Sequence, residues 1–201
     1  MDTQLFLRIN ELARATPWLH GVVVAYAAYG LVVFAALMLA GWWTARAQAS
    51  VPKMAAALWT PLGMLLALGV NQPVADAVGE PRPYSALPGL LVLAGRSTDP
   101  AFPSDHAVMA GAVTAGLFLV HRRLAAIAGV AAILMAFSRV YIAAHYPGDV
   151  LAGLALGAAV ILLGFLLVHR LLEWLVRLAQ RSALRPVFTA APGEASPRAR
   201  P

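Results

Sequence analysis

The sequence contains no cysteine and a single lysine, and only 12% of its 201 residues are charged. Without cysteine the chain forms no disulfides, no thiolate zinc sites and no iron–sulfur clusters. Soluble domains carry roughly twice this share of charged residues, so the composition excludes a soluble enzyme, and a disordered chain as well. The sequence is instead 61% hydrophobic, which is typical of a protein that crosses a membrane several times.

Five stretches are apolar enough to cross a bilayer, for which a helix needs roughly 20 apolar residues. They cover residues 20–43, 54–70, 104–120, 124–143 and 150–168. The second and third are short, and the fifth continues as a helical pattern toward residue 178. All are rich in small residues, which let membrane helices pack closely. We therefore predict an all-α integral membrane fold, a helical bundle of about five transmembrane helices with six as the alternative count.

The two ends of the chain differ from these spans. Leu5, Ile9 and Leu12 recur at helical spacing with charged residues between them, which predicts an N-terminal amphipathic helix in the membrane interface. The alternative is that this segment extends the first span. It lacks the features of a secretory signal, so we expect it to be retained. Residues 182–201 are rich in Pro, Ala and Arg, which predicts a disordered cytoplasmic tail after a single domain of residues 1–181.

Basic residues are distributed unevenly among the predicted loops. They gather between the first and second spans, between the third and fourth, and after the fifth. In a five-span bundle these segments share one side, and basic loops mark the cytoplasmic side. The net charge of +6 therefore reports orientation and not nucleic-acid binding. The loop at residues 71–103 and the turn at residues 144–149 are predicted to face outward, on the extracytoplasmic side.

The outward-facing segments carry polar residues that helix packing does not require. Arg139 lies near the end of the fourth span, where an ionisable residue is by default a functional hypothesis. His145 and Asp149 follow, with Pro147 placed to open the fifth span. A carboxylate four residues from a histidine can hold one imidazole N–H and leave the other nitrogen free as a base or nucleophile.

Two further segments would stand on the same side. Ser104 and Asp105 are good N-caps for the third span, and the free N–H groups of the first helical turn, where His106 also lies, form an anion site. In the outer loop, prolines on either side of Arg82 stiffen the chain, and arginine contacts phosphate oxygens in pairs. Singly these features are explained as a helix cap, an interface pair or a snorkelling arginine. Together they predict a site that binds a phosphate, attacks it and protonates its leaving group.

These segments resemble the signatures of the type 2 phosphatidic acid phosphatase (PAP2) superfamily of integral membrane phosphatases. Residues 103–106 read Pro-Ser-Asp-His, which is similar to the family's Pro-Ser-x-His motif. Ser138-Arg139, followed by His145 and Asp149, matches its Ser-Arg-x5-His-x3-Asp motif completely. Asp105, and the Tyr146-Pro147 pair, resemble the branch that acts on undecaprenyl diphosphate. The resemblance therefore implies a lipid phosphatase with the family's helical bundle.

The family's first motif, Lys-x6-Arg-Pro, is incomplete. Arg82-Pro83 is present, but Ala75 stands at the lysine position. Asn71 is a polar candidate upstream, and Asp76 has the wrong charge. Arg96, from the same outer loop, is a possible replacement for the missing cation. This departure bears on how the substrate is bound more than on the class of reaction.

The resemblance also implies a role for each residue. His145 is the nucleophile and forms a phosphohistidine, Asp149 orients it, and His106 protonates the leaving oxygen and then activates water. The phosphoryl oxygens are held by Arg82, Ser104 and Arg139, with backbone N–H groups at Asp105 and His106. No metal or cofactor is implied. The expected substrate is undecaprenyl diphosphate, cleaved to undecaprenyl phosphate and phosphate at the outer face of a bacterial cell membrane.

Three alternatives stay open from the sequence. The same chemistry could act on phosphatidic acid, phosphatidylglycerophosphate or a polyprenyl-phosphoryl sugar phosphate. A metal-dependent hydrolase would use Asp105, His106, His145 and Asp149 as ligands, although two nearby arginines would repel a divalent ion. The third alternative is a non-catalytic transporter or lipid-binding protein. The sequence leaves the oligomeric state open.

Overall fold

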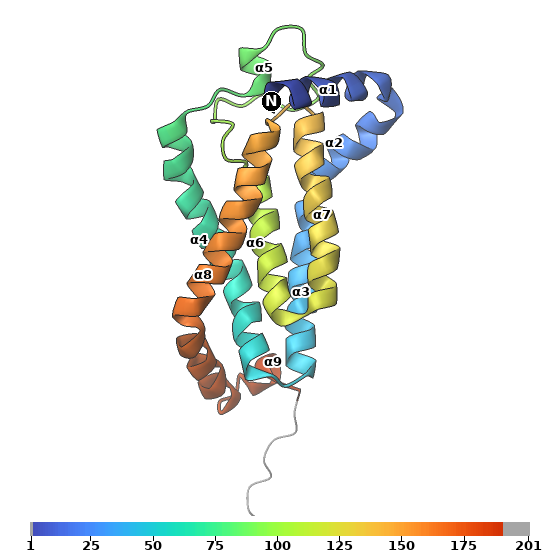
Figure 1. Cartoon of the computed structure of the whole chain (residues 1–201). Helices are drawn as coiled ribbons and strands as arrows, with labels where there is room; N and C mark the ends of the chain where they lie inside the picture. Colours follow the sequence, from blue (N-terminus) through green and yellow to red (C-terminus); the bar gives the residue numbers. More distant parts are fainter. Residues whose placement is uncertain (1, 191–201) are drawn as a thin grey trace, which may run out of the picture.

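Long helices run side by side along one axis in the computed structural model, which describes residues 2–190 (Figure 1). They are α3 (Leu31–Ala47), α4 (Val51–Val78), α6 (Asp105–Val120), α7 (Arg122–Tyr141) and α8 (Pro147–Gln180). By length and composition α4, α7 and α8 can each cross a membrane, and α2 (His20–Tyr29) with α3 makes a fourth if this pair, bent by 51°, is one span. The predicted all-α membrane bundle is confirmed, with the shorter apolar α6 as its fifth member.

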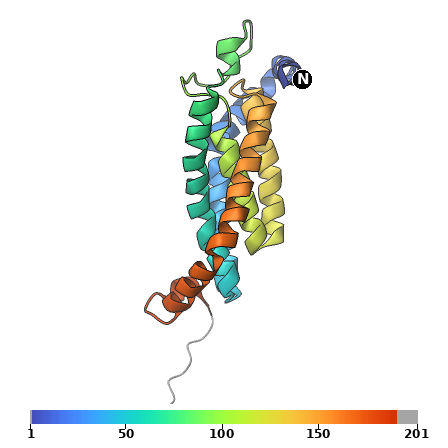
Figure 2. The ribbon, with the colours of Figure 1, turned by 60° about the vertical axis from the view of Figure 1, so that its left-hand side comes forward.

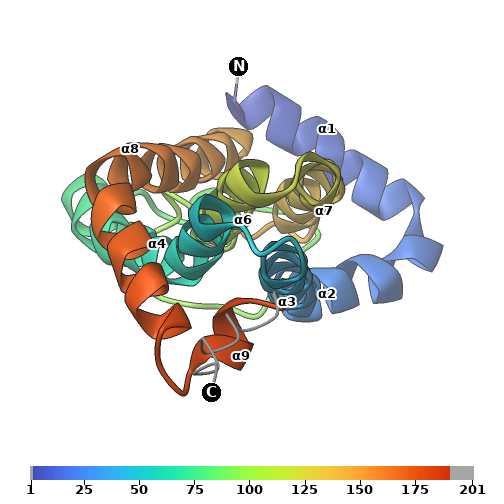
Figure 3. The ribbon, with the colours of Figure 1, turned by 90° about the horizontal axis from the view of Figure 1, so that it is seen from below.

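Helix α6 occupies the centre of the bundle, surrounded by α3, α4, α7 and α8 (Figure 3). Its close approach to α8 depends on glycine. A Cβ atom at Gly157 would lie 2.0 Å from the Val108 carbonyl oxygen, and one at Gly111 would lie 2.2 Å from the Leu154 carbonyl oxygen. Only residues without a side chain permit this backbone contact between helices. The contact fixes the ends of α6 and α8 next to each other.

The turns of the bundle divide between its two ends, as Figures 1 and 2 show. The α3–α4 turn, the α6–α7 turn and the short helix α9 (Arg185–Phe188) lie at one end. The α4–α6 loop, which contains α5 (Pro83–Ala86), and the α7–α8 turn lie at the other. This is the division that the sequence predicted for the basic loops and for the loops with candidate site residues.

Helix α1 (Asp2–Ala15) lies across the second end, and the 3-10 turn η1 (Pro17–Leu19) separates it from α2 (Figure 1). Phe6, Asn10 and Ala13 form its buried face. The Asn10 amide donates to the Leu91 carbonyl oxygen over 2.7 Å and accepts from the Leu91 N–H over 3.1 Å. The N-terminal segment is thus an amphipathic helix packed on the bundle, and not an extension of the first span.

Two predicted spans differ from the structure, and a third agrees with it. The first span is broken at Gly30 into α2 and α3. The second span was expected to end at residue 70, but α4 continues to Val78 and stops at Gly79, which has a positive φ of 60°. Hydropathy falls at Asn71 and Gln72, yet both face other protein segments and the helix continues through them. The fifth span extends to residue 180, as the helical pattern beyond residue 168 predicted.

The predicted tail is in part ordered. Within residues 182–190 the chain forms α9, and the Ala190 N–H donates to the Arg46 carbonyl oxygen over 3.1 Å. Arg46 in turn donates from its side chain to the Pro186 carbonyl oxygen. The prediction of disorder for this part is therefore wrong, because hydrogen bonds with the backbone and side chain of Arg46, at the end of α3, hold it. The rest of the predicted tail, residues 191–201, lies outside the described residues.

Candidate active site

A polar cavity of about 350 Å³ opens at the α1 end of the bundle. Side chains from α4, the α4–α6 loop, α6, α7 and the α7–α8 turn meet there. Five residues predicted for the site line it: Arg82, Asp105, His106, Arg139 and His145. Ser104 and Asp149 are fully or almost fully buried, and the Ser104 N–H donates to the Asp149 carbonyl oxygen over 3.1 Å. The fold thus brings together all three predicted segments.

The His145 imidazole is buried and held at both nitrogens. Nδ1 lies 2.7 Å from the Ala101 carbonyl oxygen, which can only accept, so Nδ1 carries the proton. Nε2 lies 3.3 Å from Nη1 of Arg82, which can only donate, so Nε2 presents its lone pair. Burial, with Arg139 and Arg82 nearby, lowers the pKa of His145 far below its usual range. The arrangement keeps a neutral imidazole beside the cavity, with its unprotonated Nε2 facing Arg82.

The Asp149 carboxylate does not hold His145 in the predicted way. Its Oδ2 atom accepts the Tyr146 N–H over 2.7 Å and lies 3.6 Å from His145 Nδ1, beyond hydrogen-bonding distance. The carboxylate therefore fixes the turn that carries His145 and acts on the imidazole through its charge. The partner of the His145 Nδ1–H group is instead the backbone carbonyl of Ala101, which no side-chain pattern in the sequence could reveal.

Glu80 is a neighbour of this pair that the sequence analysis did not single out. Its carboxyl lies within hydrogen-bonding reach of Asp149, and burial, followed by the charge of Asp149, raises the pKa of Glu80. A protonated Glu80 can donate to the Asp149 carboxylate, which lies beside His145. In the sequence Glu80 stands two residues before Arg82, and that adjacency was the available signal.

The two arginines of the cavity lack carboxylate partners within residues 2–190. Arg82 is held by backbone oxygens, donating from Nε to Asp99 over 2.9 Å and from Nη1 to Ala144 over 3.3 Å. The Nε atom of Arg139 is buried with no hydrogen-bond partner in the described chain. A buried cation without a partner is costly. Both guanidinium groups are therefore suited to an anion in the cavity.

Ser104 stands at the N-cap position of α6 and is fully buried. Its Oγ atom, like Nε of Arg139, finds no hydrogen-bond partner within residues 2–190. Buried polar atoms are nearly always paired, so each exception requires an explanation. A ligand oxygen that reaches the start of α6 would satisfy both atoms together with the free N–H groups of the first helical turn.

Asp105 contributes to the site through its position at the start of α6 and not through its carboxylate. Oδ1 accepts from the Asn71 amide over 2.7 Å and faces the Gln72 amide at 3.4 Å. Asn71 also donates to the Pro103 carbonyl oxygen over 3.2 Å. The Asp105 carboxylate thus ties α6 to α4, while its backbone N–H stays in the first turn, next to the cavity.

The vacant lysine position also faces the cavity, because Ala75 lines it one helical turn after Gln72. Arg96, the candidate replacement, lies elsewhere. Its guanidinium covers the Tyr84 ring at 5.8 Å, in a separate hollow that includes Ser85 and Thr98. On this face of α4, the polar side chain that lines the cavity is therefore Gln72.

The ligand set of the metal-hydrolase alternative is dispersed. His106 and His145 line the cavity, whereas the Asp105 and Asp149 carboxylates are engaged with α4 and with the Tyr146 N–H. In the part of the chain that the structure describes, no group of three or more His, Asp or Glu side chains is arranged to hold a metal ion.

A helical membrane bundle with a polar cavity, lined by two histidines and by two arginines that lack carboxylate partners in the described chain, defines a phosphate-handling membrane protein. Residues 56–173 match the PAP2 superfamily, and the chain belongs to this superfamily. It is a multi-pass membrane lipid phosphatase, and the predicted family and enzyme class are confirmed.

Individual relatives agree over most of the chain. It is 28% identical over 166 residues to undecaprenyl-diphosphatase BcrC of Bacillus subtilis (strain 168), covering 83% of this chain and 82% of that protein. It is 26% identical over 187 residues to a bacitracin transport permease protein BcrC of Bacillus licheniformis, covering 90% of both. The fold is that of the transmembrane PAP2-type phosphatidylglycerolphosphate phosphatase from Bacillus subtilis, with a TM-score of 0.60, 24% identity and coverage of 81% and 85% of the two chains.

Proposed function

We propose that this enzyme hydrolyses undecaprenyl diphosphate to undecaprenyl phosphate and phosphate through a phosphohistidine at His145. The observation that carries the chemistry is the unprotonated Nε2 of His145 beside a cavity with two arginines that lack carboxylate partners in the described chain. The substrate rests on the relative named undecaprenyl-diphosphatase, which aligns with 83% of the chain.

In the first step His145 Nε2 attacks the terminal phosphorus. The N–P bond forms as the bond between phosphorus and the bridging oxygen breaks. The lipid monophosphate leaves with this oxygen, which takes a proton from His106. The imidazolium that develops is stabilised by the Asp149 carboxylate at 3.6 Å and by the Ala101 carbonyl oxygen. Arg82 and Arg139 bind the phosphoryl oxygens, with Ser104 and the start of α6, and stabilise the charge of the transition state.

In the second step His106 accepts a proton from water. The resulting hydroxide attacks the phosphohistidine, the N–P bond breaks, and phosphate leaves while His145 returns to its neutral form. Since the arginines and the helix end neutralise the phosphate, this route uses no metal ion.

The site faces the extracytoplasmic side of a bacterial cell membrane in this proposal. The support is the charge of the opposite end, where Arg46, Lys53, Arg122 and Arg123 lie at the ends of α3, α4 and α7, since basic residues at the ends of spans mark the cytoplasmic side. The native chain has no cysteine, so Ser85→Cys and Ser182→Cys report on opposite ends without background. An impermeant thiol reagent on intact cells should label only the first, and labelling of only the second would reverse the orientation.

Phosphate release from purified lipid phosphates in detergent tests the reaction, with and without EDTA and with His145→Ala as the control. Undecaprenyl diphosphate should give the highest kcat/KM, EDTA should have no effect, and His145→Ala should be inactive while remaining folded. A faster reaction with phosphatidic acid or phosphatidylglycerophosphate would correct the substrate alone. Loss of activity in EDTA, restored by zinc or magnesium, would instead establish a metal-dependent hydrolase. No release from any lipid would favour transport or lipid binding.

A further inference from the structure

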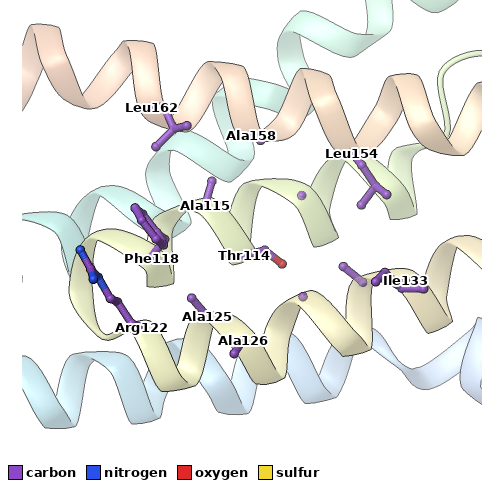
Figure 4. A pocket seen from close by; sticks show the side chains of 13 residues that line it. Thr114, Ala115, Phe118, Arg122, Ala125, Ala126, Ile133, Leu154, Ala158 and Leu162 are labelled. Atoms are coloured by element: carbon purple, nitrogen blue, oxygen red, sulfur yellow. The ribbon is translucent and has the colours of Figure 1, made fainter.

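A second cavity, of about 630 Å³, lies within the bundle between α6, α7 and α8 (Figure 4). Small residues such as Gly111, Ala115, Ala125 and Gly129 leave this space between the three helices. The hydroxyl of Thr114 is the one alcohol among its lining side chains, and it is satisfied by the Ala110 carbonyl oxygen over 2.7 Å. We refer to this space as the α7–α8 groove. Its surface suits a hydrocarbon chain.

The α7–α8 groove is distinct from the active-site cavity, and no residue lines both. A cluster of Phe6, Ala107, Tyr146 and Val150 stands at the end of the groove nearer the site, and Leu154 joins it while lining the groove. The Phe6 ring is fully buried and packs edge to face with the Tyr146 ring at 5.3 Å. Helix α1 thus packs, through Phe6, on the cluster at this end of the groove.

The opposite end of the groove carries a cation. Arg122 lies beside Phe118 at the α6–α7 turn (Figure 4), with its guanidinium 5.8 Å from the ring centroid. It forms no ion pair with a carboxylate in residues 2–190, and the exposed Arg123 follows it directly. Basic pockets between transmembrane helices on the cytoplasmic side are suited to anionic lipid head groups.

The length of the groove matches a single leaflet. Arg122 and Ile133 both line the groove and lie eleven residues apart on α7, which at roughly 1.5 Å per residue amounts to about 16 Å. This is close to half of the roughly 30 Å hydrocarbon core of a bilayer. A groove of this length accommodates one acyl chain whose head group lies at the level of Arg122.

We propose that the α7–α8 groove binds an anionic phospholipid of the leaflet at the α6–α7 turn. One acyl chain lies between α7 and α8, and the lipid phosphate contacts Arg122 and Arg123. The bound chain fills the space that the small residues leave and supports α7, which carries Arg139 at its other end. The inference stands apart from the identity of the substrate, because the lipid occupies the side of the bundle that the site does not use.

The test measures binding of phosphatidylglycerol to the full-length protein in detergent, with phosphatidylcholine of the same acyl chains as the neutral comparison. Wild type should bind phosphatidylglycerol more tightly. Arg122→Gln should weaken that binding roughly tenfold through loss of a charge-assisted contact. Gly129→Leu should abolish it, because a Cβ atom there makes only an ordinary contact with Thr114 at 3.8 Å and the rest of the leucine side chain occupies the groove that Gly129 lines.

Two matched variants serve as controls. Gly69→Leu adds the same side chain on α4 at a position with nothing within 4 Å, and Arg170→Gln removes an exposed charge that does not line the groove. Both should bind phosphatidylglycerol as wild type does. Equal binding of the two lipids by wild type, or unchanged binding by Gly129→Leu, would overturn the proposal. A third outcome would also overturn it, namely that Gly129→Leu loses binding of undecaprenyl phosphate but still binds phosphatidylglycerol. The groove would then hold the undecaprenyl chain of the product.

Discussion

Replacing Phe6 with alanine should release α1 from the end of the bundle and impair catalysis. Phe6 is fully buried, and its ring packs against Tyr146, the residue that follows His145. Truncating a buried phenylalanine costs about 3–5 kcal/mol, of which the aromatic pair accounts for about 0.5–1.5 kcal/mol. The polar anchors of α1 that remain are the two hydrogen bonds of Asn10 to Leu91, the bond from the Gly148 N–H to Asp2 and the bond from the Arg14 side chain to the Gly89 carbonyl oxygen, at about 1 kcal/mol each. The loss is therefore of the same size as all that these bonds retain, and α1 should open far more often.

Limited trypsin digestion measures this release, because Arg8 and Arg14 lie within α1. Since about 1.4 kcal/mol corresponds to a tenfold change, the loss of packing should raise the open population of α1, and with it the cleavage rate, by about a hundredfold or more. The value of kcat should also fall, because Tyr146, in the turn that carries His145, loses the Phe6 ring against which it packs.

Leu5→Ala is the matched control, since Leu5 precedes Phe6 on α1 but is 51% exposed. It should be cleaved and should turn over as wild type does. Wild-type cleavage and wild-type kcat in Phe6→Ala would refute the reasoning. Equal sensitivity of Leu5→Ala would show that contact with lipid, and not packing on Tyr146, holds the helix.

The remaining predictions concern helix packing, pH dependence and the lysine position. Gly157→Ala should lower the melting temperature, because its Cβ atom would lie 2.0 Å from a carbonyl oxygen of α6, whereas Gly69→Ala, in open space, should preserve or raise it; equal melting temperatures would contradict this. Because the pKa of His145 is lowered by burial and the nearby arginines, the neutral nucleophile persists as the pH falls below the ordinary histidine pKa of about 6.5, so the acid limb of kcat/KM should lie below that value. Arg82→Gln should move this limb to higher pH, and an unmoved limb would dissociate it from His145. Ala75→Lys should tighten inhibition by vanadate roughly tenfold if the cavity can use another cation, and unchanged or weaker inhibition would show that it cannot.

The residues of the site were predictable because their spacing and the loop charges point to the same end of the bundle. Arg139, His145 and Asp149 lie within eleven residues of one another, so one helix end and one turn suffice to place them. Arg82 and His106 come from other segments, and the number of spans predicts that they share that end. None of this required the details of packing.

What the sequence could not provide depends on contacts between segments. The polar residues Asn71 and Gln72 predicted the end of a span, but α4 continues through them. Hydropathy cannot reveal that both amides face Asp105 on a neighbouring helix. The partner of His145 Nδ1 is the backbone of Ala101, and every residue has such a carbonyl group. Arg96 was a reasonable substitute for the missing lysine by its position in the loop, but it packs on Tyr84 outside the cavity.

The glycine contact between α6 and α8 sets how the enzyme responds to the thickness of its membrane. Helix α8 has 34 residues and must tilt when a bilayer is thinner than its apolar length. Because backbone atoms of α6 and α8 touch at Gly111 and Gly157, α6 tilts with it as one rigid unit. A change of bilayer alters how deeply the phosphate cavity lies below the head groups, while the spacing between the start of α6 and the start of α8 stays the same.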